Sequence, residues 1–179
     1  MKILPVIIFS FLLFSCSIFE FGYFYITDGS SNRGKLEGRV FKSKYTKYEI
    51  GPLPEGWKRI DIKGGDIAFW NKALGGTITV DSTCEKNLGS DPEALAENLL
   101  AGVTDRELIE KRNLGVDGEE AFEGVYTGRI GKFPIKVGAI VLRKGNCVYD
   151  LTYASAPDNF QQGVNIFRDF VLGFKVLPK

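Results

Sequence analysis

The sequence of 179 residues contains no histidine and only three cysteines. Without histidine, neither a Ser-His-Asp triad nor a Cys-His pair can form, which closes the usual route to an activated serine or thiol. The two cysteines in the body of the chain, Cys84 and Cys147, cannot assemble an ordinary zinc site without histidine. We therefore expect no metal site, no cofactor and no catalytic residue of these types.

The chain also lacks any block of one charge, since 23 basic residues face 22 acidic ones. A neutral chain without a Lys/Arg cluster gives no electrostatic reason to bind nucleic acid. The glycine pairs at 64–65 and 75–76 lack the Lys-Ser/Thr ending of a phosphate-binding loop and are typical of hairpin turns. We expect no nucleic-acid partner.

The first informative feature of the sequence is its amino-terminal segment. Lys2 is followed by an apolar run from Ile3 to Phe14 and then by Ser15 and Cys16, an order typical of an export signal. The segment Leu13-Phe14-Ser15-Cys16 resembles the cleavage box of bacterial lipoproteins, which implies that lipid is attached to Cys16. We predict a signal peptide over 1–15, a lipidated aromatic segment and linker over 16–35, and one folded domain over 36–179.

A second interpretation of this region stays open. Read as one run, Ile3 to Ile26 is long enough for a single membrane-spanning helix, which needs about 20 residues. Both interpretations keep Lys2 on the cytoplasmic side and place the domain outside the cytoplasm. If the anchor is lipid, Ser17 after the cysteine implies the outer membrane, facing the periplasm, in a diderm cell, and the outer face of the cytoplasmic membrane otherwise.

The two remaining cysteines are candidates for a disulfide. Cys84 closes one strand-like run and Cys147 opens another, so neighbouring strand ends can bring them together. An exported domain lies in an oxidising compartment, where paired thiols tend to be joined. The alternative is a pair of buried free thiols that act as small apolar side chains.

Two hydrophobic periods alternate along the domain and predict an α+β fold. Glycine turns separate short strands at 58–62, 66–71 and 77–84, and further strands are expected at 107–114, 120–130, 135–142 and 147–153. A helix is expected from Pro92 to Gly102, capped by Asp91. A second helix starts at a capping-box-like segment from Ser155 to Asp158, with Phe160, Val164, Phe167 and Val171 on one face, and ends at Gly173.

Six short motifs occur in this order: Pro54-Glu55-Gly56-Trp57, Ala68-Phe69, Thr79-Val80, Gly118-Glu119-Glu120-Ala121, Tyr149-x-Leu151-x-Tyr153 and Gly173-Phe174. Together they resemble the PsbP-like α-β-α sandwich proteins, particularly small bacterial lipoproteins of that fold. The resemblance implies a single antiparallel sheet of about six to seven strands packed with two main helices. It also implies a scaffold for binding or assembly.

Aromatic and acidic residues supply the remaining candidates. Trp57 and Trp70 could anchor a partner, since aromatic residues dominate contact hot spots, or could cover the ends of the sheet. Carboxylate pairs at Glu119-Glu120, or at Asp61 and Asp66, could in principle cleave a glycosidic bond. Neighbouring residues on a strand point to opposite faces, however, so the first pair is not expected to share a site.

These observations favour a membrane-anchored envelope lipoprotein that binds an envelope protein as an accessory or assembly factor and is not an enzyme. The alternatives are a small carboxylate-dependent hydrolase that acts on envelope polymers and a purely structural envelope component.

Overall fold

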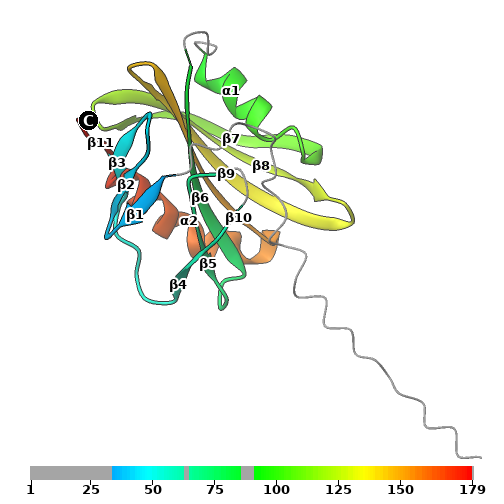
Figure 1. Cartoon of the computed structure of the whole chain (residues 1–179). Coiled ribbons are helices and arrows are strands. Elements are labelled where there is room, and N and C mark those ends of the chain that lie inside the picture. The colour runs from blue at the N-terminus through cyan, green and yellow to red at the C-terminus, as the bar shows by residue number, and fades with distance from the viewer. Residues whose placement is uncertain (1–33, 63–64, 86–90, 179) are drawn as a thin grey trace, which may run out of the picture.

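The computed structural model describes residues 34–62, 65–85 and 91–178, which form two antiparallel sheets and two helices (Figure 1). The larger sheet has the order β4-β5-β6-β10-β9-β8-β7, and the smaller one has the order β1-β2-β3-β11. The strands of the larger sheet are β4 (Trp57–Ile60), β5 (Ile67–Asn71), β6 (Gly76–Cys84), β7 (Thr104–Val116), β8 (Glu119–Ile130), β9 (Phe133–Lys144) and β10 (Cys147–Ser155). Those of the smaller sheet are β1 (Lys35–Glu37), β2 (Val40–Lys42), β3 (Lys47–Glu49) and β11 (Lys175–Val176).

The predicted α+β class is confirmed: an antiparallel sheet of about six to seven strands with two main helices was expected, and the larger sheet has seven strands. The smaller sheet was not predicted. Its three amino-terminal strands have three residues each, and its fourth strand pairs Lys175 with Glu49 across most of the domain. Strands this short do not show an alternating hydrophobic pattern, and their partners lie far away in the sequence. They could therefore not be predicted from the sequence.

Helix α1 (Pro92–Leu99) starts as predicted, because the Asp91 carboxylate accepts a hydrogen bond from the backbone nitrogen of Glu93 at 3.0 Å. It ends three residues before the predicted Gly102. Among the described residues, no helix is long and apolar enough to cross a membrane.

Helix α2 (Pro157–Leu172) departs from its prediction at the start. The predicted capping box does not form: Ala156 is the N-cap residue, and the Ser155 hydroxyl donates instead to the carbonyl oxygen of Ala156 at 3.0 Å. Proline at the first helical position needs no partner for a backbone N–H, so the helix begins without a side-chain cap. Gly173 ends it, as expected.

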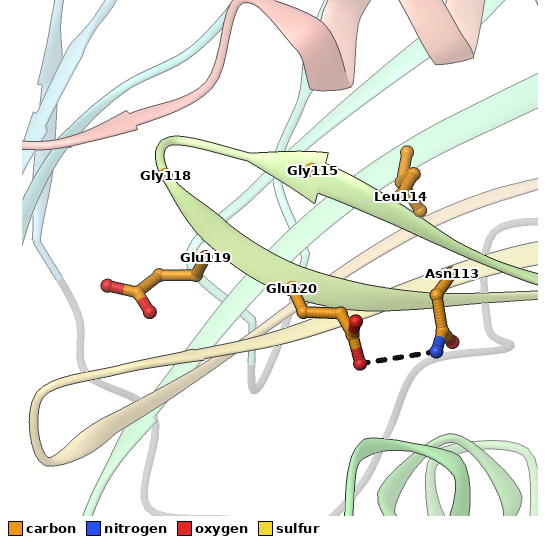
Figure 2. A pocket seen from close by; sticks show the side chains of 6 residues that line it. All are labelled: Asn113, Leu114, Gly115, Gly118, Glu119 and Glu120. Carbon is orange, nitrogen blue, oxygen red and sulfur yellow. Dashed lines mark hydrogen bonds between the residues drawn. The ribbon is translucent and has the colours of Figure 1, made fainter.

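The chain leaves the middle of the larger sheet at β6, crosses through α1, and enters β7 at the far edge. It then returns by hairpins through β8 and β9 to β10, which pairs with β6. The first of these hairpins, β7–β8, turns on Asp117 and Gly118, whose positive φ angles of 51° and 79° suit a tight two-residue turn (Figure 2). This route makes β7 the outermost strand.

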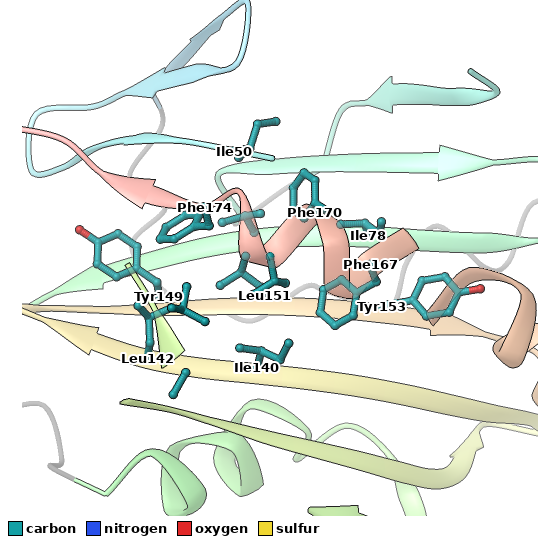
Figure 3. Packing of buried hydrophobic residues seen from close by; sticks show 14 of the residues in the cluster. Ile50, Ile78, Ile140, Leu142, Tyr149, Leu151, Tyr153, Phe167, Phe170 and Phe174 are labelled. Atoms are coloured by element: carbon teal, nitrogen blue, oxygen red, sulfur yellow. The ribbon is translucent and has the colours of Figure 1, made fainter. Parts of the chain in front are cut away.

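The main core lies between α2, the smaller sheet and one face of the larger sheet (Figure 3). The predicted stripe of α2 faces this core, with Phe160, Val164, Phe167 and Val171 all buried. On the other face, α1 covers two smaller clusters, in which its Ala96 packs with Phe122. The domain is therefore layered, with α2 and the smaller sheet on one side and α1 on the other.

Candidate functional site

The three predicted cysteine positions have different outcomes. Cys16, with the predicted signal and linker, lies outside the described residues. Cys84 and Cys147 are register partners on β6 and β10 and are joined by a disulfide, with an S–S distance of 2.06 Å. The predicted bridge is confirmed, and it joins neighbouring strand ends as expected.

The two tryptophans do not share a site. Trp57 pairs with Asn71 and Trp70 pairs with Lys58, so their side chains lie on opposite faces of the sheet. The Trp57 ring contacts Tyr153 edge-on, with the centroids 6.3 Å apart, and packs against the main core. This is the structural role that was weighed for it. A binding role for either indole stays a prediction.

Asp66 is buried, whereas Asp61, the other member of the carboxylate pair considered from the sequence, is exposed. The Oδ2 atom of Asp66 accepts hydrogen bonds from the Tyr48 hydroxyl at 3.0 Å and the Ser82 hydroxyl at 2.5 Å. Because Tyr48 belongs to β3 and Ser82 to β6, this carboxyl group connects the smaller sheet to the larger one. The side chain is only 8% exposed.

Among the described residues, Asp66 is one of three acidic side chains with raised pKa values. Burial is the main cause for each, and it raises the pKa of Asp66 to about 7, that of Asp81 to about 6 and that of Asp150 to about 7. Asp81 and Asp150 are register partners on β6 and β10, so the charge of Asp81 raises the pKa of Asp150 further. Within the described part of the chain, no cluster of three ligand-type side chains could hold a metal ion.

A hollow of about 420 Å³ lies at the end of the β7–β8 hairpin (Figure 2). We call it the hairpin hollow; it is lined by Asn113, Leu114, Gly115, Gly118, Glu119 and Glu120. The Asn113 side-chain amide donates to Oε1 of Glu120 at 3.2 Å. The carboxylates of Glu119 and Glu120 point apart, as their strand positions predicted, so they do not converge on one point.

Strand β7 runs beside the hairpin hollow and forms the edge of the larger sheet. It is 13 residues long and mostly exposed, and β8 is its partner in the sheet order. The register with β8 shifts between Thr104 and Glu107 and again between Leu108 and Glu110. From Glu110 to Val116 every residue has a regular partner.

Charged side chains hold this edge strand in place on both faces. Arg112 of β7 forms an ion pair with Glu123 of β8, which also pairs with Arg168 of α2 at 2.7 Å. On the other face, Lys111 reaches Glu93 of α1 at 2.7 Å. The strand is therefore fixed to both helical layers, and in the described part of the chain no further strand pairs with its outer edge.

This surface was not predicted from the sequence, although one signal for it was available. Asp117-Gly118, flanked by strand-like residues, is the dipeptide most typical of a two-residue hairpin. It could have placed the hairpin hollow. The position of β7 at the sheet edge depends on strand order, which no local motif shows.

No protein-family model and no curated protein sequence matches this chain. Among solved structures, it is similar to cyanobacterial PsbP (CyanoP) from Synechocystis sp. PCC 6803, with a TM-score of 0.59 and 17% sequence identity, over 80% of this chain and 98% of that one. This chain has the PsbP-like fold.

A second similar structure is that of LpqN, a protein of Mycobacterium tuberculosis involved in cell envelope biogenesis. Its TM-score is 0.55 at 11% identity, over 74% of this chain and 86% of that one. A protein from Bacteroides thetaiotaomicron gives 0.54 at 9% identity, over 80% of this chain and 50% of that one. At these identities the similarity establishes the fold alone.

Proposed function

We propose that this protein is an envelope lipoprotein, anchored through Cys16, that binds an envelope protein as a non-catalytic accessory or assembly factor. The observation that carries the proposal is the Cys84–Cys147 disulfide, which fits a domain that works in an oxidising compartment outside the cytoplasm. The export-type amino terminus supports the same location through separate residues.

The anchor follows from the chemistry of the amino terminus. Two or three acyl chains on Cys16 hold a protein durably, because each buried methylene contributes about 0.8 kcal/mol. In a diderm cell we place the protein in the outer membrane, facing the periplasm, and otherwise on the outer face of the cytoplasmic membrane.

The binding role is supported by the surface rather than by a cavity. Among the residues that the structure describes, no strand pairs with the outer edge of β7, and such an edge is a ready template for another chain. The similar structure of LpqN, a protein involved in cell envelope biogenesis, supports the same class of function.

Photochemical cross-linking in living cells tests this proposal. A photoreactive residue is placed in the full chain at one exposed position at a time: Glu37, Arg59, Asn113 or Gln161. We expect a discrete envelope-protein adduct from at least one position, with a yield that saturates as the partner is consumed. A Cys16→Ala variant should lose the adduct together with its membrane location. The absence of adducts at all four positions would contradict the binding role.

A further inference from the structure

We propose that the regular half of strand β7, Glu110–Val116, accepts an extended basic segment of a partner protein as an eighth strand of the larger sheet. The hairpin hollow takes the basic side chains at the end of that segment. This inference rests on the proposed binding function and specifies its surface and the chemistry of the partner.

The position of β7 at the edge of the larger sheet is the main support for this proposal. In the described sheet, β7 is the terminal strand and pairs with β8, so its outer backbone groups have no strand beside them. An extended peptide that lies along such an edge gains main-chain hydrogen bonds at every second residue. The opposite edge strand, β4, has only four residues, Trp57–Ile60, and offers a much shorter template.

Only one half of β7 is regular enough to pair with a partner strand. Bulges and irregular register protect natural sheet edges, because they twist the strand away from a straight partner. Both irregularities of β7 lie before Glu110, while the residues from Glu110 to Val116 pair without a break. Neither half contains proline, another residue that blocks edges. The carboxyl-terminal half is therefore the part that a partner strand can use.

Strand β7 is already held in the conformation with which a partner strand would pair. Arg112 is paired with Glu123, and the turn residue Asp117 accepts hydrogen bonds from Lys144 Nζ at 2.7 Å and from the backbone nitrogen of Val176 at 2.9 Å. The hairpin is thus tied to β9 and to the smaller sheet. A surface held in its bound form loses little conformational freedom when a partner docks.

The charges of the hairpin hollow indicate the chemistry of the partner. Glu119 and Glu120 line the hairpin hollow, and among the described residues neither forms an ion pair, although Glu120 accepts a hydrogen bond from Asn113. The hollow is roomy because Gly115 and Gly118 have open space around them: a Cβ atom on either would meet no heavy atom within 4 Å. Lysine or arginine side chains complement these two negative charges, whereas an acidic segment is repelled.

The test is a titration of the purified full chain in detergent micelles with two synthetic peptides, followed by amide NMR. The basic peptide is acetyl-(Val-Lys)₃-Val-amide, and its counterpart carries glutamate in place of lysine. We expect the basic peptide to shift the amide signals of residues 110–120 and to slow amide exchange within 110–116. The acidic peptide should leave both unchanged.

Two matched variants separate the charge contribution from general electrostatics. E119Q/E120Q removes the two carboxylates of the hairpin hollow, and two surface ion pairs correspond to a loss of affinity of about fivefold. E55Q/D61N removes two exposed carboxylates beside β4, at the opposite edge of the sheet from β7, and should leave the affinity within about twofold. Both variants have the same net charge.

The proposal is overturned if the basic peptide does not bind, if it shifts signals away from 110–120, or if both peptides bind equally. It is also overturned if E55Q/D61N weakens binding as much as E119Q/E120Q does. When peptide binding fails but photoreactive residues outside β7 capture a partner, the accessory function stands and only this surface is wrong. If peptide binding and capture at every position both fail, the accessory function is contradicted as well.

Discussion

Arg168 in helix α2 donates a hydrogen bond from its guanidinium Nε to Oε1 of Glu123 in strand β8, over 2.7 Å. The Glu123 side chain is only 2% exposed, and its other oxygen pairs with Arg112 of the edge strand. Arg168 also lies 3.5 Å from Glu110 of the same strand. One buried carboxylate therefore links α2, β8 and β7, and it supports the surface on which we expect a partner to bind.

Replacement of Glu123 by glutamine should destabilise the domain, because two guanidinium groups lose their shared counter-charge. Breaking a fully buried ion pair costs about 3–5 kcal/mol, but Arg112 is half exposed, so we expect a loss of about 2 kcal/mol. Urea unfolding measures the difference. Glu107→Gln, at an exposed position of β7, is the control and should change stability by less than about 0.5 kcal/mol. A Glu123 variant as stable as its parent would show that the cluster contributes nothing.

The disulfide should account for a large share of the stability. It links residues 63 positions apart, and the loop-closure estimate for such a bridge is about 4 kcal/mol. We expect the double variant Cys84→Ser/Cys147→Ser to melt at a lower temperature than the oxidised protein. Reductant should lower the melting temperature of the oxidised protein and leave that of the double variant unchanged. Two thiols that react freely in the denatured, unreduced protein would rule out the bridge.

Asp66 should make the protein more stable in mild acid than at neutral pH. Its pKa is about 7 in the folded protein and near the ordinary value of 3.8 in the unfolded chain, so between these values the folded state binds the extra proton. The free energy of unfolding therefore falls as pH rises through this window.

The Asp66→Asn variant tests this contribution, since asparagine can still accept the two hydroxyl hydrogen bonds but does not titrate. We expect the pH dependence of unfolding between pH 5 and 7.5 to shrink by about 2 kcal/mol. Asp61→Asn, at a nearby exposed position, is the control. An Asp66→Asn variant with the pH profile of its parent would mean that this carboxyl group is charged in the folded protein.

The parts of the fold that were predicted are those with local causes. The stripe of Phe160, Val164 and Phe167 determines which face of α2 is buried, and this follows from helical spacing alone. Asp91 caps α1 because a carboxylate before a helix satisfies a free backbone N–H, which is again a contact within a few residues. The disulfide was predictable for a related reason, since both cysteines lie at strand ends.

The parts that were not predicted depend on contacts between distant segments. The smaller sheet needs β11 to pair with β3, and the burial of Asp66 needs Tyr48 from that same sheet. The edge position of β7 needs the crossover through α1. In each case the surroundings of a residue depend on segments that are distant in the sequence, and its neighbours in the sequence do not predict them. The hairpin hollow was also missed, although it lies within one hairpin and its turn residues Asp117 and Gly118 are adjacent in the sequence.

Mass spectrometry of the native protein, purified from membranes without reductant, would show directly whether the domain is lipid-anchored outside the cytoplasm. We expect a mature chain that begins at an acylated Cys16 and contains Cys84 linked to Cys147. An unmodified chain that begins at Met1 and carries free thiols at both positions would contradict it.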